Sequence, residues 1–188
     1  MRQFIRRMAD KFTKEQRSHC MSQIRSKDTR PEVIVRRFLH AGGFRYRLNV
    51  ASLPGSPDIV LSRYRTVVFV NGCFWHGHRG CRLFVLPKTR VGFWAGKIER
   101  NQRRDAAVSA RLEAHGWNVI TVWECQLKKD RRETTLAALR EQILHNGELL
   151  AAETASRRAA RLAYRAELRA RKARHTALQQ ELSEKFSL

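Results

Sequence analysis

Long apolar runs are missing from this sequence. The longest purely apolar stretches, such as residues 67–70, have the length of a strand, whereas a membrane-spanning helix needs about 20 residues. The first ten residues are basic and lack the apolar segment and the small-residue cleavage site of a secretory signal. We therefore expect a cytoplasmic protein that has no membrane partner.

Cysteine is also scarce, with four residues in a chain of 188. In a reducing cytoplasm these residues are expected to be thiols or metal ligands rather than disulfides. No internal repeat and no Pro- or Ser-rich linker divides the chain, and its length fits one compact domain with an extension. A multidomain machine is excluded.

Acidic residues are few compared with basic ones. The 17 Asp and Glu stand against 38 Lys and Arg, so the formal net charge is +21, while 43% of the residues are hydrophobic, which is enough for a core. Residues 1–30 carry 9 basic and 3 acidic side chains, and residues 151–188 carry 9 and 4. Because positive charge occurs in every segment, a nucleic acid is favoured as the partner over an anionic lipid surface.

Hydrophobic spacing and capping residues predict five helices. In one of them, Asp28 or Thr29 can cap the first turn, Pro31 is tolerated inside that turn, and Gly42-Gly43 ends the helix. The others are expected over about 13–25, 91–115, 131–144 and 149 into the 180s. Asn146-Gly147 is expected to separate the last two.

Four segments are predicted to be strands, at residues 44–50, 58–61, 66–70 and 117–123. The alternation of apolar and polar residues along the first of these indicates a half-buried strand, and the short turn between the second and third indicates a tight hairpin. Together with the helices, this order indicates an α/β fold in which helices flank a mixed sheet.

Four potential ligands are spaced in a way that fits a closed tetrahedral zinc site. They are Cys73, His78, Cys81 and Cys125. The first three lie in a long loop predicted before residue 90, and the fourth follows a predicted strand, so the ion would tie the loop to the sheet edge. His76 could replace His78 as the ligand, because ring spacing alone does not decide. In the alternative interpretation Cys73 and Cys125 are buried apolar thiols and His78 is a surface histidine.

Asp58 stands at the start of a predicted strand, where a carboxylate can hold Mg²⁺ against a phosphate. Many nucleases of the restriction type add an acidic residue and a lysine on the next strand, but residues 66–70 contain neither. In a nuclease, His76 would then be the general base, since histidine titrates near neutral pH. The alternative for Asp58 is a turn carboxylate at the start of the strand.

Two aromatic pairs, Phe74-Trp75 and Phe93-Trp94, flank the proposed metal loop. One interpretation is that they pack beneath this loop. On a basic protein they can also act as apolar wedges inserted between base steps of a duplex. Both interpretations can hold, with some of these residues packed beneath the loop and others acting as wedges.

Several ordered motifs together closely resemble the very short patch repair (Vsr) endonucleases, and this resemblance runs from about residue 13 to 145. The motifs are 21–32 (MSQIRSKDTRPE), 53–58 (LPGSPD), 70–78 (VNGCFWHGH), 87–90 (PKTR), 93–94 (FW) and 122–125 (VWEC). The resemblance implies a restriction-endonuclease-like fold with a mixed central sheet. It also implies a Mg²⁺-dependent nick in duplex DNA on the 5′ side of the thymine in a T:G mismatch. Such mismatches arise when 5-methylcytosine deaminates, and the nick initiates very short patch repair.

The resemblance further implies how the protein is organised and what it works with. Residues 1–148 would form the endonuclease domain, including an N-terminal DNA-binding helix, and residues 149–188 would be a basic helical extension outside the resemblance. The enzyme would be monomeric, cytoplasmic and associated with the nucleoid. A functional link to a cytosine-5 DNA methyltransferase and to other repair proteins is also implied.

Catalytic roles carry over by motif from the same resemblance. Asp58 would bind Mg²⁺ together with the main-chain carbonyl of Val70. His76 corresponds to the catalytic histidine of the family, Asp105 would orient it, and Glu32 would position water.

The resemblance also implies roles outside the reacting centre. Cys73, His78, Cys81 and Cys125 match the ligands of a structural Zn²⁺. Phe74, Trp75 and Trp94 match the aromatic residues wedged beside the mismatch, and Met21 would approach from the other groove.

The chain departs from some relatives at two points, since Asn71 replaces a histidine and the segment between Cys73 and Cys81 is one residue longer. Two rival functions come from the residues themselves. The first is a zinc-stabilised nucleic-acid-binding protein without catalysis, and the second is a nuclease of the same fold that acts on a recombination junction or on single-stranded DNA.

Overall fold

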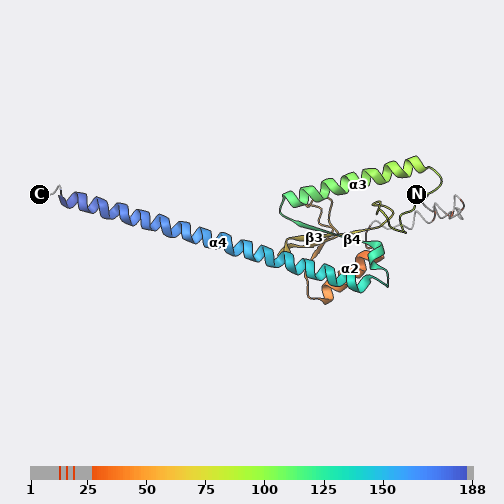
Figure 1. Cartoon of the computed structure of the whole chain (residues 1–188), viewed down its shortest axis with the longest axis horizontal. Helices are drawn as coiled ribbons and strands as arrows, with labels where there is room; N and C mark the ends of the chain where they lie inside the picture. The colour runs from red at the N-terminus through yellow and green to blue at the C-terminus, as the bar shows by residue number, and fades with distance from the viewer. Residues whose placement is uncertain (1–12, 14–15, 17–18, 20–26, 186–188) are drawn as a thin grey trace. The chain divides into compact units, whose positions relative to one another are not determined.

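The structure is a computed structural model, and it describes residues 13, 16, 19 and 27–185 (Figure 1). The described chain divides into two compact units, Met1–Leu144 and His145–Leu188. Most of the helix predicted over 13–25, including Met21, lies outside the described residues, so its role in DNA binding stays a prediction. None of the described helices combines the length and the apolar composition needed to span a membrane.

Helix α2 spans Arg30–Ala41, as its capping residues predict. Thr29 is the N-cap, Pro31 lies in the first turn, and Gly42 follows the last residue of the helix. One face of α2 is fully buried, because Val35 and Leu39 pack into the main hydrophobic core.

The sheet has four strands in the order β1-β2-β3-β4, which are Arg47–Leu48, Ile59–Leu61, Thr66–Asn71 and Asn118–Trp123. The pairs β1–β2 and β2–β3 are antiparallel, whereas β3–β4 is parallel. A short 3₁₀ turn, Ser62–Tyr64, closes the β2–β3 hairpin. The prediction of a mixed sheet with a tight hairpin is therefore confirmed. Assignment to the restriction-endonuclease-like fold stays a prediction.

Strand β1 is much shorter than the seven residues that alternation predicts. Only Arg47 and Leu48 pair with β2, and both are exposed, so the prediction of a half-buried strand is wrong. The apolar residues of this segment pack individually instead. Phe44 is buried against Tyr64, with ring centroids 5.3 Å apart, and the Tyr46 hydroxyl donates to the backbone carbonyl of Arg36 at 2.9 Å.

Helices cover both faces of the sheet within Met1–Leu144 (Figure 1). On one face, α2 and the first turns of α4 (Arg132–Lys185) contribute buried side chains that include Leu136, Leu139 and Ile143. On the other face, α3 (Val91–Ala114) packs Leu112 and Val108 against the β2–β3 hairpin. Because β3 is followed by α3 and then by the parallel strand β4, this part of the chain is a β-α-β crossover.

Helix α4 is continuous from Arg132 to Lys185, so the predicted break at Asn146-Gly147 is wrong. A glycine inside a helix costs about 1 kcal/mol relative to alanine. The residues on both sides are mostly strong helix formers such as Ala, Leu, Arg and Glu, and together they outweigh that cost. The turn signal of the Asn-Gly pair is therefore overridden by its surroundings.

Candidate active site and metal centre

All five residues predicted to act in catalysis or to bind Mg²⁺ line one cavity of about 630 Å³. They are Glu32, Asp58, Val70, His76 and Asp105. They come from the start of α2, the loop before β2, the end of β3, the loop after β3, and α3. The strand and helix ends therefore bring together residues that are up to 73 positions apart in the chain.

Asp58 is held against the neighbouring strand by a backbone hydrogen bond. The N–H of Val70 donates to Oδ2 of Asp58 at 2.8 Å. Burial raises the pKa of Asp58 above its usual value; the Val70 bond opposes this shift, and the nearby charge of Glu32 adds to it. A divalent cation at this position would reverse the shift, because it favours the charged carboxylate.

His76 is oriented by Asp105. Its Nδ1 lies 2.5 Å from Oδ2 of Asp105, which comes from α3. Burial raises the pKa of Asp105, but the hydrogen bond and the charge of His76 outweigh it, so the pKa lies below the usual value. Since Nδ1 is engaged by Asp105, a role as base falls to Nε2 of the same ring.

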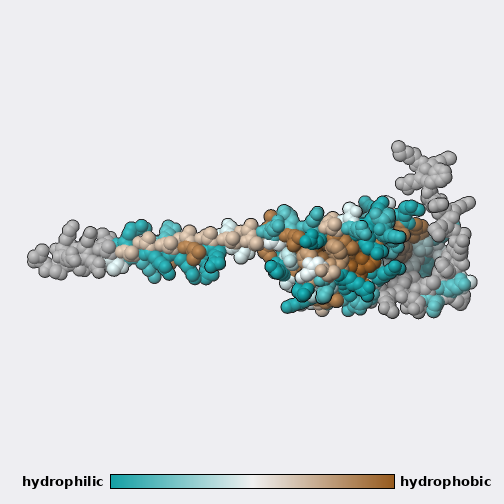
Figure 2. Space-filling view, turned by 90° about the horizontal axis from the view of Figure 1, so that it is seen from below, coloured by the Kyte–Doolittle hydropathy of each residue, from teal (hydrophilic) through white to brown (hydrophobic). Residues whose placement is uncertain are grey.

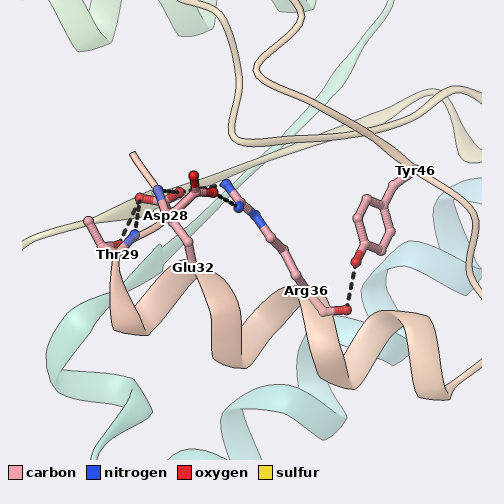
Figure 3. Close-up of polar contacts among 5 residues, drawn as sticks. All are labelled: Asp28, Thr29, Glu32, Arg36 and Tyr46. Carbon is pink, nitrogen blue, oxygen red and sulfur yellow. Dashed lines mark hydrogen bonds and ion pairs between the residues drawn. The ribbon is translucent and has the colours of Figure 1, made fainter. Parts of the chain in front are cut away.

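Glu32 is buried within a network of polar contacts at the start of α2 (Figure 3). Its carboxylate accepts hydrogen bonds from the Thr29 hydroxyl at 2.7 Å and from the N–H of Asp28 at 3.1 Å. One turn along the helix, the buried Arg36 guanidinium donates to Glu32 at 2.6 Å and also pairs with Asp28. This network holds a negative charge at the wall of the cavity.

Replacing Arg36 with methionine is expected to lower the free energy of unfolding by about 3–5 kcal/mol, because Glu32 would stay buried without its countercharge. The adjacent Arg37 is exposed, so Arg37→Met is a matched control and should change stability by no more than about 0.5 kcal/mol. Urea unfolding of both variants measures the difference. Equal midpoints would contradict a role for Arg36 in holding Glu32.

The four predicted soft-metal ligands also converge. One ligand atom from each of Cys73, His78, Cys81 and Cys125 lies within 4.8 Å of all the others. The Nδ1 atom of His78 is 3.5 Å from Sγ of Cys73 and 3.4 Å from Sγ of Cys125. Its ring stacks on Trp123, with centroids 4.1 Å apart and planes 7° from parallel. Of the two histidines in this loop, the structure thus places His78 with the cysteines and His76 against Asp105.

The chemistry of this cluster suits a metal ion. Burial and the adjacent Cys125 and Cys81 thiols raise the pKa of Cys73 to about 12, because closely spaced thiolates repel one another in a poorly solvated place. A coordinated cation removes this penalty, since it deprotonates the thiols that bind it. The group Cys73, His78, Cys81 and Cys125 could therefore hold a metal, and it would join the loop after β3 to the end of β4.

Comparison with known proteins identifies the family of the chain. The sequence model of the family described as DNA mismatch endonuclease Vsr matches residues 9–82. The type II nicking enzyme V.XorIIP of Xanthomonas oryzae pv. oryzae is 52% identical over 120 residues, which are 64% of this chain and 88% of the relative. The DNA mismatch endonuclease Vsr of Escherichia coli K12 is 44% identical over 136 residues, 72% of this chain and 86% of the relative. The chain belongs to the Vsr family.

As a member of this family the protein is a DNA endonuclease that acts on mismatched DNA. The chain spans most of each relative, whereas the match to the Escherichia coli enzyme leaves more than a quarter of this chain outside it. This chain therefore carries sequence beyond the part it shares with the family.

The aromatic residues of this Vsr-family chain form a cluster beside the cavity. The rings of Phe74, Trp75 and Trp94 meet edge to face, with centroids 5.2–6.0 Å apart, and all three are half-buried. Phe93 packs on Trp94 and is 46% exposed. The ammonium of Lys97 lies 5.1 Å from the Trp75 centroid and favours an anionic ligand nearby. Partial exposure leaves these rings available for contact with a base pair.

Two polar residues of α3 that sequence reasoning missed hold the loop after β3. Asn101 donates its side-chain amide to the carbonyl of Trp75 at 2.9 Å, and Gln102 donates to that of Gly77 at 3.0 Å. Gly77 has a φ of +62°, and a Cβ there would meet Gln102 at 2.4 Å and Ile98 at 2.7 Å. The loop thus approaches α3 more closely than any other residue type at position 77 would allow.

A sequence signal exists for some of the residues that were missed. Arg36 follows Glu32 by four positions on a helix whose same face carries Val35 and Leu39, so the two charges were predictable as a buried i,i+4 pair. Asn101 and Gln102 lie among many charged residues of α3, and nothing in their spacing distinguishes them from a solvated face.

Proposed function

We propose that this endonuclease nicks duplex DNA on the 5′ side of the thymine in a T:G mismatch, in a Mg²⁺-dependent reaction that initiates very short patch repair. The observation that carries the proposal is the single cavity in which Asp58, Glu32 and the His76–Asp105 pair meet beside the aromatic cluster. The membership in a family of DNA mismatch endonucleases supports the substrate class.

Asp58 and the main-chain carbonyl of Val70 would hold Mg²⁺, which supplies positive charge to the scissile phosphate and to the leaving oxygen. The Val70 N–H holds one oxygen of Asp58, and this bond also fixes the orientation of the carboxylate and thus the position of its other oxygen. Glu32 would position the attacking water. Because the Arg36 guanidinium holds its carboxylate, this position is set before DNA binds.

His76 would take a proton from that water through Nε2. Asp105 would hold the ring in the tautomer with a proton on Nδ1, and it would stabilise the imidazolium that forms. Attack in line with the leaving oxygen breaks the bond between phosphorus and the 3′ oxygen. It leaves a 5′-phosphate and a 3′ oxygen that takes a proton from solvent to become a hydroxyl. The reaction is therefore a hydrolysis with one histidine as general base.

The aromatic cluster suits the choice of a mismatch. A T:G pair is weakly stacked and easily distorted, so wedging Phe74, Trp75 and Trp94 beside it costs less free energy than at a matched step. Zn²⁺ is the ion proposed for the Cys73, His78, Cys81 and Cys125 group, since three thiolates and an imidazole are a typical structural zinc set. This ion would fix the loop that carries the wedge.

The proposal is tested with labelled duplexes that differ in one base pair, T:G or T:A, incubated with the full chain in Mg²⁺ or in EDTA. We expect a single nick 5′ of the mismatched thymine, in Mg²⁺ only. A Holliday junction and a single strand of the same sequence serve as controls. Equal cleavage of the matched duplex, or faster cleavage of a junction or single strand, would contradict T:G specificity.

A further inference from the structure

The part of α4 beyond residue 150 is a fully exposed helix with a strongly uneven charge. Every residue from 151 to 176 is exposed. This segment contains eight Arg and Lys residues but only two acidic ones, Glu153 and Glu167. Glu153 pairs with Arg157 on the surface, where such a pair contributes little stability. The segment therefore carries a large positive charge and contributes no side chain from residues 151–176 to a hydrophobic core.

Most of these basic residues share one side of the helix. At about 100° per residue, six of them fall within a sector of about 120°. We call the six basic residues of this sector the basic face, and they are Arg157, Arg158, Arg161, Arg165, Arg169 and Lys172. Arg171 and Arg174 lie outside it. Figure 2 shows hydrophilic residues along much of this helix, next to a paler band of mildly hydrophobic ones.

The other side of the helix is lined by small residues. Ala159, Ala163, Ala166, Ala170 and Ala173 fall in a sector of about 80° that does not overlap the basic face. An interfacial membrane helix typically carries large apolar residues such as Leu, Phe and Trp on that side. An alanine face buries little area, so this helix is poorly suited to a lipid surface. The partner is therefore better indicated by the basic face.

We propose that the basic face binds the phosphate backbone of duplex DNA outside the mismatch. The spacing is compatible with this partner. Residues 157, 161, 165 and 169 recur about every 6 Å along the helix, and B-DNA carries a charge about every 1.7 Å of its axis, so the phosphates are dense enough for each basic residue to face one. Five of the six residues are arginine, whose guanidinium can bind phosphate with two hydrogen bonds. The proposal rests on the proposed function only in requiring DNA as the substrate.

Contacts of this kind raise affinity without reading sequence, since phosphates are alike at every base pair. The basic face would therefore tighten binding to matched and mismatched duplexes by the same factor. It would leave the rate of nicking in the bound complex unchanged.

The test uses the full chain and two matched double variants. Arg161→Gln with Arg165→Gln removes two charges from the basic face, and Arg171→Gln with Arg174→Gln removes two from the same helix outside it. Dissociation constants for matched and T:G duplexes are measured between about 50 and 200 mM salt. Loss of two phosphate contacts should make the log–log salt slope of the first variant shallower by about 1.8, and the second should keep the wild-type slope.

A third variant, Arg161→Lys with Arg165→Lys, keeps both charges and should restore most of the slope. Equal slopes for the two glutamine variants at equal helix content by circular dichroism would overturn the proposal. A second pair of results would also overturn it: sedimentation shows a dimer that forms without DNA through the alanine face, and the basic-face variant binds DNA like the wild type. Failure of the wild type to nick a T:G duplex would refute the proposed function, but it would leave the comparison of slopes intact.

Discussion

Asp58→Asn is expected to lower the rate of nicking by about a thousandfold or more and to leave binding to a T:G duplex almost unchanged. Metal ions stabilise the charge of the transition state by several kcal/mol, and each 1.36 kcal/mol is tenfold in rate. Asparagine keeps a side-chain oxygen that can accept the Val70 N–H, so the local structure is preserved while the charge is lost. Single-turnover nicking and gel-shift binding measure the two effects.

Asp130→Asn is the matched control, because this carboxylate is 75% exposed and lies outside the cavity. It should nick at the wild-type rate. If Asp58→Asn remained active while Asp58→Ala lost both nicking and binding, Asp58 would be a structural residue that ties the start of β2 to β3. Partial rescue of Asp58→Asn by Mn²⁺, by contrast, would agree with a metal site.

Cys125→Ala is expected to remove the zinc proposed for this group and to destabilise the loop between β3 and α3. Cys125 lies in the short 3₁₀ helix Glu124–Leu127 after β4, and it is the one ligand of the four that does not come from this loop. Without it, the ion loses the connection between the two parts of the chain. Structural zinc sites contribute on the order of 10 kcal/mol to folding in small zinc domains, so the effect should be large.

Metal analysis by mass spectrometry should show about one zinc per wild-type chain and almost none in Cys125→Ala, with a clear drop in the urea midpoint. Cys20→Ala is the control, because this cysteine is not one of the four predicted metal ligands. A Cys125→Ala protein that retains one zinc and unfolds at the wild-type midpoint would show that the four residues are not the metal centre.

The elements with strong local signals were predicted well from the sequence. Helix α2 begins at its Thr29 cap and ends before Gly42, and α3 ends at Ala114, two residues before Gly116, which has a φ of +74°. Caps and left-handed glycines act within one turn of the chain, so nearby residues are enough to identify them.

The two mistaken elements depended on interactions that local patterns do not contain. The apolar residues that alternate in 44–50 are explained by the packing of Phe44 and the hydrogen bond of Tyr46. They do not form a long ladder of hydrogen bonds with β2. The Asn146-Gly147 signal is real, but its cost is small beside the helical preference of the long segments around it. In both cases a weak local preference was outweighed.

The site shows the same division. The residue types and spacing of the four-residue metal group, and the carboxylate before β2, were visible in the sequence because metal chemistry restricts ligands to a few residue types. The choice between His76 and His78 was open, since the two rings are only two positions apart. The fold separates them, because His78 stacks on Trp123 near the thiols while His76 meets Asp105 on α3.

The sequence by itself determined the charge of the chain, the order of its main elements, the candidate ligands and the resemblance to the Vsr family. Only the tertiary structure decided which groups meet. The parallel pairing of β3 with β4 brings Cys125 to the loop after β3, and the packing of α3 over the sheet brings Asp105 to His76. The tertiary structure also showed that Arg36 holds Glu32. The reason is physical, since a distance between residues far apart in the chain depends on how helices and strands pack rather than on their local sequence.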